Sequence, residues 1–472
     1  MHSQEIALKP ATELRNLIGK KALSVAEVIQ ASLEQIDRHN DTINAVVTLN
    51  EHALNQAKKL DELHARNQNE GLLFGLPVGI KDVTPVAGLH NTFGSKLFAD
   101  HIASEDALIV RRLKQAGAII IGKTNTPEFT AGGNTFNEVF GRTRNPWNPN
   151  LSAGGSTGGG AAALATGMIA LAEGTDLGGS LRIPASFCGL VGLRPSPGLV
   201  PTYPSDYLWD YLEVSGPMAR TAEDVALMLQ AVSGHSPLTP VSQSTLGRDF
   251  LAVVQAGIPK GLHLAYCADI AGIGIDAGLA KICRQAALHI SQVGAQVEEI
   301  AFDLAFARKA FLDFRGYWFV SKLHRHLDKL SQLSENVRDN IQAGLKLTIQ
   351  DLAASEQTRR EVWQKFHTFF EKYDFLLTPC MAVPPFPVEE NYPRTVAGKK
   401  MQTYVDWIAP TFLLSLTSLP VASVPCGLDE NGLPVGLQIV GRPRGEETVL
   451  ALAKQVQGMH PVGLPPLTNT ES

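Results

Sequence analysis

Two serines in this chain stand on glycine-rich turns and could act as nucleophiles. Ser156 lies in AGGSTGGG at residues 153–160, and Ser180 lies in GTDLGGSLRIP at residues 174–184. Consecutive glycines let a backbone approach a ligand closely and turn its N–H groups toward it, which is how an oxyanion is held during acyl transfer. Four residues of the second turn can supply such donors: Leu177, Gly178, Gly179 and Ser180. Two ordinary tight turns are the alternative interpretation, and the local pattern favours neither.

A serine hydroxyl is a weak nucleophile until a neighbouring group takes its proton, and Lys81 is the candidate for that group. It directly follows the apolar segment 76–80, which predicts a buried strand. Burial would lower the pKa of the lysine and leave it neutral, as a base must be. Ser156 could then pass a proton from Ser180 to Lys81 and return it to the leaving amine. An exposed lysine at a strand end is the commoner case, and only the flanking residues and the two serine turns argue against it.

Three further polar residues border the two serines. We expect Asp176 and Arg182 to form an ion pair that holds the turn, because an arginine cannot serve as a base at ordinary pH. Thr157 either orients Ser156 or fills its turn. We predict structural support from all three.

Together these segments resemble the amidase signature family. The stretch 154–184 matches the family's Gly-Gly-Ser-Ser/Thr-Gly-Gly core and its Gly-Thr-Asp-x-Gly-Gly-Ser-x-Arg-x-Pro continuation, and Gly79-Ile80-Lys81-Asp82 matches its third element. The resemblance covers most of the chain and is weakest from about residue 237 to 371. It extends through the segments 121–125, 145–147, 187–193, 216–221 and 432–438.

The resemblance implies a Ser-Ser-Lys triad in which Ser180 is the acyl-accepting nucleophile, Ser156 the bridging serine and Lys81 the base. It places Leu177, Gly178 and Gly179 at oxyanion-hole positions. It also implies a cis peptide bond between Gly179 and Ser180. No metal or organic cofactor is expected.

Short apolar runs alternate with helical patterns along the chain, which predicts an α/β fold. We predict strands at 76–80, 118–121, 168–172, 263–267, 375–378, 419–424 and 435–440. Helices are predicted after the capping box at Ser24 and at 106–115, 161–165 and 221–232, with a loop from 145 to 160.

No linker divides the chain, so we expect one domain over 1–472. It has a helical N-terminal segment of about 1–70, a signature core of about 71–235 and a helical elaboration of about 303–373. The resemblance implies a large, mixed, twisted central sheet with helices on both faces.

Composition narrows the class of protein. The 472 residues are 44% hydrophobic and 18% charged, with a net charge of −5 and no long run of one sign, so neither nucleic acid nor anionic lipid is expected as a partner. No apolar run is long enough for a membrane span or a signal peptide. The five cysteines contain no Cys-x-x-Cys pair, which indicates a reducing compartment and predicts a cytoplasmic location.

Other reactive residues have plainer interpretations. His324 and His326 alternate and would not share a helical face, so we expect them to be solvated rather than metal ligands. Cys188 stands in an apolar setting typical of a small buried residue.

The function predicted is hydrolysis of a small-molecule amide to an acid and ammonia or an amine, and a homodimer is left open. The glutaminase subunit of a tRNA-dependent amidotransferase is the alternative within the family. A nucleophile elbow at Ser156 with His460 as partner, and a dinucleotide site at 158–163, both lack the strand that must precede them. Specificity is expected from the helices after Asp303 and from four residues outside the signature: Phe129, Asn134, Tyr207 and Trp209.

Overall fold

An eleven-stranded mixed sheet runs through the computed structural model, which describes residues 2–68 and 71–469. Its order is β1-β3-β2-β8-β10-β9-β16-β17-β13-β11-β12 in the described residues. The strands are β1 (Val46–Leu49), β2 (Pro77–Lys81), β3 (Ile119–Thr124), β8 (Leu171–Asp176), β9 (Val191–Arg194), β10 (Val214–Ala219), β11 (His263–Tyr266), β12 (Gln296–Glu299), β13 (Phe375–Pro379), β16 (Val421–Leu428) and β17 (Pro434–Val440).

Three two-stranded sheets stand apart from this one in the described part of the chain. They pair β4 (Phe136–Asn137) with β5 (Gly141–Arg142), β6 (Arg144–Asn145) with β7 (Asn148–Ser152), and β14 (Thr395–Val396) with β15 (Lys399–Lys400).

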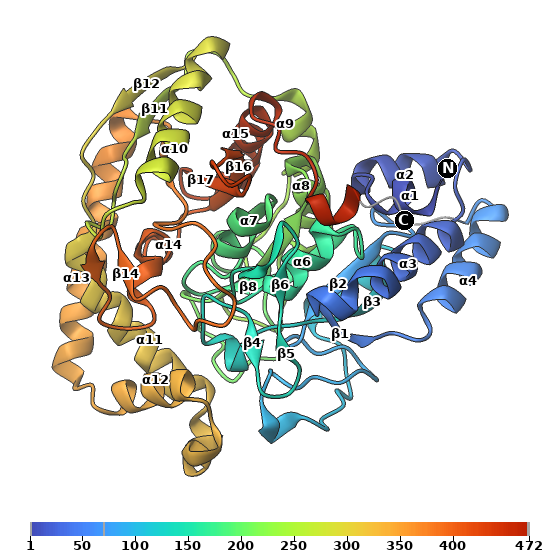
Figure 1. Cartoon of the computed structure of the whole chain (residues 1–472), viewed down its shortest axis with the longest axis horizontal. Helices are drawn as coiled ribbons and strands as arrows, with labels where there is room; N and C mark the ends of the chain where they lie inside the picture. Colours follow the sequence, from blue (N-terminus) through green and yellow to red (C-terminus); the bar gives the residue numbers. More distant parts are fainter. Residues whose placement is uncertain (1, 69–70, 470–472) are drawn as a thin grey trace.

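Helices surround the central sheet (Figure 1). They are α1 (Ser3–Ala7), α2 (Ala11–Gly19), α3 (Val25–Ile43), α4 (Ala53–Ala65), α5 (Leu108–Gln115), α6 (Gly158–Ala165), α7 (Arg182–Cys188), α8 (Ala222–Val232), α9 (Phe250–Ala256), α10 (Ala277–His289), α11 (Arg308–Lys322), α12 (Glu335–Leu345), α13 (Ile349–Lys372), α14 (Ala409–Ser415) and α15 (Glu446–Met459).

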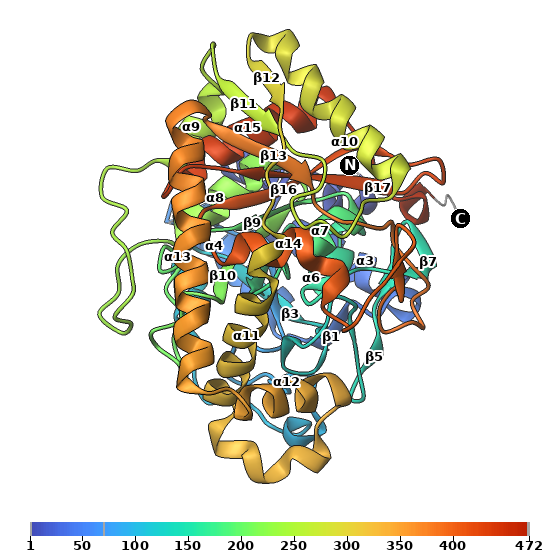
Figure 2. The same cartoon turned by 90° about the vertical axis from the view of Figure 1, so that its left-hand side faces the viewer.

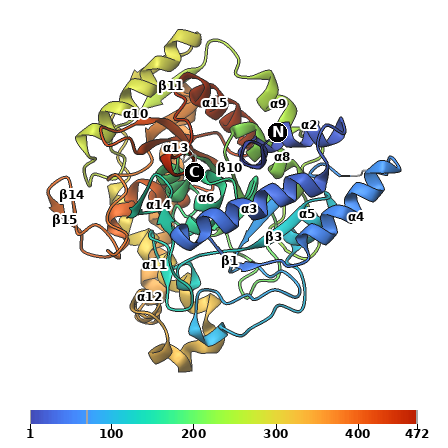
Figure 3. The ribbon, with the colours of Figure 1, turned by 45° about the vertical axis from the view of Figure 1, so that its right-hand side comes forward.

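Both faces of the sheet are covered. Strand β16 lies between α15 on one side and α7 on the other, and α8 and α9 pack beside α15 (Figures 1 and 2). At the N-terminal edge α3 and α4 lie together over β1 and β3 (Figure 3). This arrangement confirms the predicted α/β fold with one mixed sheet and helices on both faces.

Three neighbouring strands run in parallel at the part of the sheet that carries the signature residues. Strand β2 pairs in parallel with β3 on one side and with β8 on the other, and Ile80 stands opposite Lys123 and Glu173. The carboxyl ends of parallel strands meet at one edge of a sheet, where ligands of α/β proteins bind. Lys81 at the end of β2 therefore lies beside Thr175, near the end of β8.

The outer helices α11, α12 and α13 form a separate layer at one end of the molecule (Figure 2). Helices α11 and α12 approach each other at two glycines. A Cβ on Gly316 would come within 2.9 Å of the Cα of Gly344, and a Cβ on Gly344 within 2.2 Å of the carbonyl oxygen of Gly316. Only glycine at both positions allows this backbone contact.

Most predicted elements occur with small shifts. The capping box at Ser24 opens α3, and Thr221 caps α8. The strand expected at 168–172 begins three residues later, because 168–170 form a turn after α6 and the strand extends to Asp176. The predicted loop 145–160 is wrong in part, since the hairpin β6–β7 and the first turn of α6 fall inside it.

Within residues 2–68 and 71–469, none of the helices has the length and apolar character needed to cross a lipid bilayer.

Candidate active site

Lys81 and Ser156 are in direct contact in the interior. The Lys81 Nζ lies 2.7 Å from the Ser156 Oγ and 3.0 Å from the Thr175 Oγ1, and neither Lys81 nor Ser156 exposes any surface. The parallel pairing of β2 and β8 explains the contact with Thr175, and the turn before α6 brings Ser156 over the end of β2.

Burial lowers the pKa of Lys81 to about 8, although the carboxylates of Glu213, Glu173 and Asp176 oppose that shift. Low dielectric disfavours the ammonium form, so a lysine in this place gives up its proton near neutral pH. Lys81 can then accept a proton from Ser156 while it donates to Thr175. The structure confirms the sequence prediction that Lys81 is buried at the end of a strand and that burial lowers its pKa.

The two serine turns touch through their backbones. The Thr157 N–H donates to the carbonyl oxygen of Ser180 at 3.2 Å. Ser180 is partly exposed, whereas the rest of the turn from Gly174 to Leu181 is buried. In the described part of the chain no hydrogen bond joins the Ser180 hydroxyl to that of Ser156, so the contact between the turns is made by main chain. The Thr157 hydroxyl lies 3.5 Å from the carbonyl oxygen of Thr175.

The expected cis bond is at the other serine. The peptide between Gly155 and Ser156 is cis, whereas the one between Gly179 and Ser180 is not, and that prediction was wrong. Gly155 lies against the backbone of residues 132–134, where a Cβ would come within 2.9 Å of the carbonyl oxygen of Gly132. Packing of this turn against a second loop was not visible in the sequence.

Asp176 braces the Ser180 turn. Its carboxylate accepts the N–H of Gly179 at 2.9 Å and of Leu181 at 3.2 Å, and it pairs with Arg182 at 3.0 Å and Arg194 at 3.2 Å. Burial alone would raise the pKa of Asp176, but the two guanidinium groups outweigh it and hold the pKa below its ordinary range. The predicted ion pair is present, and Arg194 is a third member that the sequence did not reveal.

The Gly179 N–H is thus engaged with Asp176, unlike the other three N–H groups assigned to the oxyanion hole. Among the described residues, those of Leu177, Gly178 and Ser180 have no acceptor within the protein. The hydroxyl of Thr411 fixes the turn from the far side by donating to the Gly178 carbonyl oxygen at 2.7 Å.

A second set of buried charges lies behind Lys81. Glu173 accepts the backbone N–H of Lys81 at 3.1 Å and the hydroxyl of Thr84 at 2.9 Å. Lys123 lies 3.6 Å from the carboxylate of Asp82, and neither side chain is exposed. Burial lowers the pKa of Lys123 to about 8 and raises the pKa of Glu173 and of Asp82. These groups hold the end of β2 and do not reach either serine.

A cavity of about 680 Å³ opens beside this cluster and reaches Thr175. One wall is apolar and includes the rings of Phe93, Phe98 and Phe129, whose centroids lie within 6.0 Å of one another. The other wall comes from the loop 202–215 and from the end of α11 with the turn after it. It carries Glu213, Lys322 and His326.

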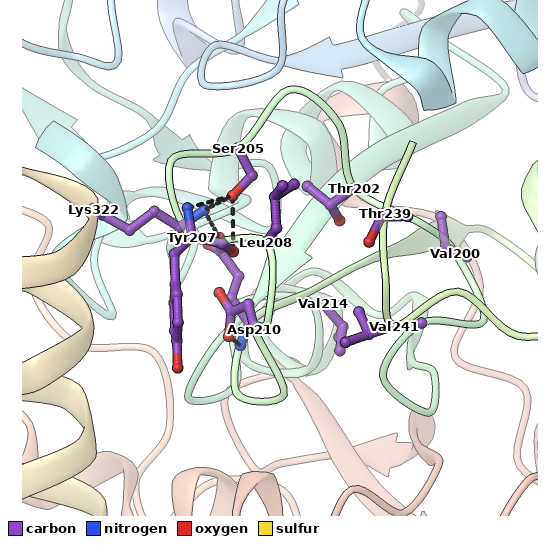
Figure 4. A pocket seen from close by; sticks show the side chains of 12 residues that line it. Val200, Thr202, Ser205, Tyr207, Leu208, Asp210, Val214, Thr239, Val241 and Lys322 are labelled. Atoms are coloured by element: carbon purple, nitrogen blue, oxygen red, sulfur yellow. Dashed lines mark hydrogen bonds and ion pairs between the residues drawn. The ribbon is translucent and has the colours of Figure 1, made fainter. Parts of the chain in front are cut away.

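A small side chamber of about 20 Å³ shares Thr202, Ser205, Glu213 and Lys322 with the large cavity. Figure 4 shows Lys322 reaching across from its helix toward Ser205, with Tyr207 and Asp210 beside it. The chamber is too small for an organic substrate.

Of the residues expected to govern specificity, some line the cavity or its side chamber and others do not. Phe129 lines the large cavity and Tyr207 lines the side chamber. Asn134 does neither, because its amide donates to the carbonyl oxygens of Val388 and Glu390 and so ties two loops together. Trp209 is 61% exposed and lines neither space. The helices after Asp303 contribute through the end of α11, as expected.

The remaining reactive residues lie away from this cluster. Cys188 is buried, and burial raises the pKa of its thiol far above the ordinary value, as expected for a small core residue. His324 is exposed, but His326 is half-buried with its ring edge-on to Phe98, so it is not simply solvated. No cluster of metal-ligating side chains occurs in residues 2–68 and 71–469.

The alternative nucleophile elbow is not supported by the fold. The strand nearest before Ser156 is β7, which belongs to a two-stranded sheet and not to the central one. Residues 158–163, which match the dinucleotide pattern, lie inside the buried helix α6.

Thr175 and Glu213 were the principal omissions from the sequence-based site. Thr175 stands in the motif beside Asp176 and contacts the lysine directly. Its place within the motif could have drawn attention to it, whereas Glu213 and Lys322 have no local signal.

Comparison with known proteins agrees with this geometry. The family model described as Amidase matches residues 27–450. An acylamidase of Rhodococcus erythropolis is 33% identical over 472 residues, covering 98% of this chain and 97% of that protein. A glutamyl-tRNA(Gln) amidotransferase subunit of Moorella thermoacetica is also 33% identical, covering 95% of this chain and 96% of that protein.

The fold is shared with solved structures as well. The crystal structure of a bacterial aryl acylamidase of the amidase signature family superimposes with a TM-score of 0.90 at 26% identity, covering 96% of each chain. Together with the family model, which spans most of the sequence, these matches show that the chain belongs to the amidase signature family and is a hydrolase of carbon–nitrogen bonds.

Proposed function

We propose that this chain hydrolyses a carboxylic amide through a covalent acyl-Ser180 intermediate, with Ser156 carrying protons between Ser180 and Lys81. The observation that carries the proposal is the 2.7 Å contact of the Lys81 Nζ with the Ser156 Oγ in a site without solvent exposure. A neutral lysine in that position is a base, and the serine between it and the nucleophile is a relay.

In the first half of the reaction the Ser180 oxygen attacks the carbonyl carbon of the amide. Its proton passes to Ser156, and the proton of Ser156 passes to Lys81. The ammonium of Lys81 then returns a proton through Ser156 to the leaving nitrogen, the carbon–nitrogen bond breaks, and ammonia or an amine departs. Thr175 accepts a hydrogen bond from Lys81 throughout and keeps the lone pair of the lysine directed at Ser156.

In the second half water attacks the acyl-Ser180 ester and gives up its proton along the same path. The carboxylic acid leaves and Ser180 regains its proton. Negative charge on the carbonyl oxygen is held by backbone N–H groups of the Ser180 turn. Leu177, Gly178 and Ser180 are the donors that we assign to this role, because the Gly179 N–H is engaged with Asp176.

The apolar wall of the cavity favours an amide that carries a ring or a branched apolar group. Three phenylalanines form that wall, and the space of about 680 Å³ is within the range of sites for small organic ligands. The acylamidase and the aryl acylamidase among the relatives are consistent with such a substrate.

A glutaminase role within an amidotransferase is the second candidate. The amidotransferase protein of Moorella thermoacetica is as similar in sequence as the acylamidase is. Ammonia release by the isolated chain separates the two, using an aryl amide, an aliphatic amide and glutamine. Turnover of the aryl amide without other proteins supports the first function, and release from glutamine alone supports the second.

Labelling of Ser180 tests the chemistry. A fluorophosphonate probe should add mass to the peptide that contains Ser180, and hydroxylamine added to a good amide substrate should yield a hydroxamate. Trypsin leaves both serines in one peptide, so a second protease must divide them. Label on Ser156 with Ser180 unmodified would overturn the assignment, and so would an absence of label on both.

A cytoplasmic location stays a prediction from the cysteine pattern. A homodimer likewise stays open.

A further inference from the structure

Glu213 lies beside the base although it is far from it in sequence. It directly precedes β10, whose antiparallel pairing with β8 places Val214 opposite Asp176 and Ser215 opposite Thr175. The Glu213 side chain is only 12% exposed, and it lines both the large cavity and the side chamber. This carboxylate therefore stands where the substrate cavity meets the end of β8.

Its contacts connect the outer helices to the catalytic lysine. The Lys322 Nζ lies 3.6 Å from the Glu213 carboxylate. It also donates to the Ser205 Oγ at 2.9 Å, as the dashed line between these two labelled residues in Figure 4 indicates. On its other side Glu213 shares the wall of the large cavity with Thr175, whose hydroxyl accepts from Lys81 at 3.0 Å. Lys322, Glu213, Thr175 and Lys81 thus follow one another from the outer helix α11 to the base.

We propose that Glu213 is a positioning residue for the catalytic base: it accepts a hydrogen bond from the Thr175 hydroxyl, fixes that hydroxyl as acceptor for Lys81, and places a negative charge beside the lysine. This inference rests on the proposed role of Lys81. A hydroxyl that donates to Glu213 can only accept from Lys81, which leaves the Lys81 lone pair for Ser156.

The other carboxylates near Lys81 are committed elsewhere. Asp176 is paired with both Arg182 and Arg194. Glu173 is bound to the Lys81 backbone and to Thr84, and it also faces Lys123.

Glu213 faces Lys322, Asp210 and Lys81, and its partner Lys322 is at 3.6 Å. Burial raises the pKa of Glu213, Lys322 opposes that shift, and Glu213 in turn opposes the lowering of the pKa of Lys81. Of the three carboxylates only Glu213 lines the substrate cavity.

The test measures the rate of Ser180 labelling by a fluorophosphonate as a function of pH, followed by intact-protein mass. It needs no knowledge of the substrate. For the unaltered protein the rate should fall tenfold for each pH unit below about 8, because only neutral Lys81 is a base. Glu213→Gln removes the charge but keeps an acceptor for Thr175, so the midpoint should move down by about one pH unit with a similar maximal rate.

Two further variants sharpen the result. Glu213→Ala removes both the charge and the acceptor, so the midpoint should move down and the maximal rate should also fall by roughly 10-fold. Glu299→Gln makes the same chemical change at an exposed ion pair and should leave the midpoint unchanged. Thermal unfolding of each variant confirms that the fold is intact.

Failure of the inference and failure of the proposed function give different results. If Lys81→Met labels at the rate of the unaltered protein, the base itself is wrong and the inference falls with it. If Lys81 is required but the profile of folded Glu213→Gln superimposes on those of the unaltered protein and Glu299→Gln, the role of Glu213 alone is overturned.

Discussion

The signature core and the outer helices differ in where their charged side chains lie. In the core Lys81, Lys123, Asp176, Arg182 and Arg194 expose no side-chain surface, and each has partners of opposite charge or hydrogen-bonding groups. The outer region from α11 to α13 keeps most of its charges at or near the surface, with Asp313 and Arg315 of α11 as buried exceptions, and the turn 324–332 has no buried residue. Buried charge fixes geometry because moving either partner leaves the other unpaired in low dielectric.

The difference in burial suggests that the core carries the chemistry and the outer layer the substrate selectivity. Helices α6 and α7, which flank the two serines, have every residue buried. The outer layer reaches the cavity with Trp318, Lys322, Leu323 and His326, which stand at the end of α11 and just after it. We infer that the core resists substitution and that the outer helices can change the substrate with less damage.

The largest effect should follow removal of the base in the core. Lys81→Met keeps the bulk of the side chain but has no group to take the Ser156 proton, so amide turnover should fall by roughly 10⁴-fold or more. A double variant with Ser156→Ala should lose little beyond the worse single variant, because the two residues act in one proton path. Steady-state kinetics of the purified proteins, with circular dichroism as the check on folding, measure this. Retained turnover in folded Lys81→Met would remove the distinction between core and outer region.

A buried and an exposed ion pair give the second comparison. Asp176→Asn leaves two buried guanidinium groups without a counter-charge and should cost about 3–5 kcal/mol of unfolding free energy. Glu299→Gln breaks the pair with Arg284, in which Glu299 is 44% and Arg284 52% exposed, and should cost far less because solvent screens an exposed pair. Urea unfolding at pH 7 measures both, and equal costs would contradict the comparison.

The stability that the buried ion pairs of Asp176 contribute depends on pH, and the sign of that dependence follows from the pKa of Asp176. The pKa of Asp176 is held below its ordinary value, so its contribution to stability is complete above about pH 4, the usual pKa of aspartate. The contribution is lost as the pH falls toward the folded pKa. The unaltered protein and Asp176→Asn should therefore become more similar in stability as the solution is acidified.

The smallest effect should come from the outer wall of the cavity. Trp318→Phe enlarges the space beside Lys322 and removes the hydrogen bond from the indole N–H to Asp210. The ratio of kcat/KM for a bulky aryl amide to that for a small aliphatic amide should change by roughly 10-fold. Trp363→Phe, at an indole 42% exposed on α13, is the control and should leave that ratio unchanged. Equal losses on both amides would place Trp318 with the catalytic core instead.

Much of the fold was predictable because its signals are local. The capping boxes, the apolar run before Lys81 and the glycines that end helices each depend on a few neighbouring residues. The hairpin β6–β7 was missed because its prolines and asparagines are typical of loops, and its second strand pairs at the surface with a strand of two residues.

The site was predictable only in part. The pairing of Lys81 with Ser156 came from the family motifs and not from spacing, because 75 positions separate the two residues. Glu213 could not be assigned, because its contact with Thr175 depends on which strand pairs with β8. Lys322 depends in addition on the placement of a helix more than a hundred residues further along the chain.

The glycine contact between α11 and α12 is a site, distant from the cavity, at which laboratory evolution could change substrate selectivity. Any side chain at Gly344 would meet the backbone of Gly316, so α11 would have to shift, and Trp318 and Lys322 would shift with it. A position on the outer layer that touches neither the cavity nor the serines can therefore alter which amide is accepted. Libraries confined to the residues that line the cavity would never sample it.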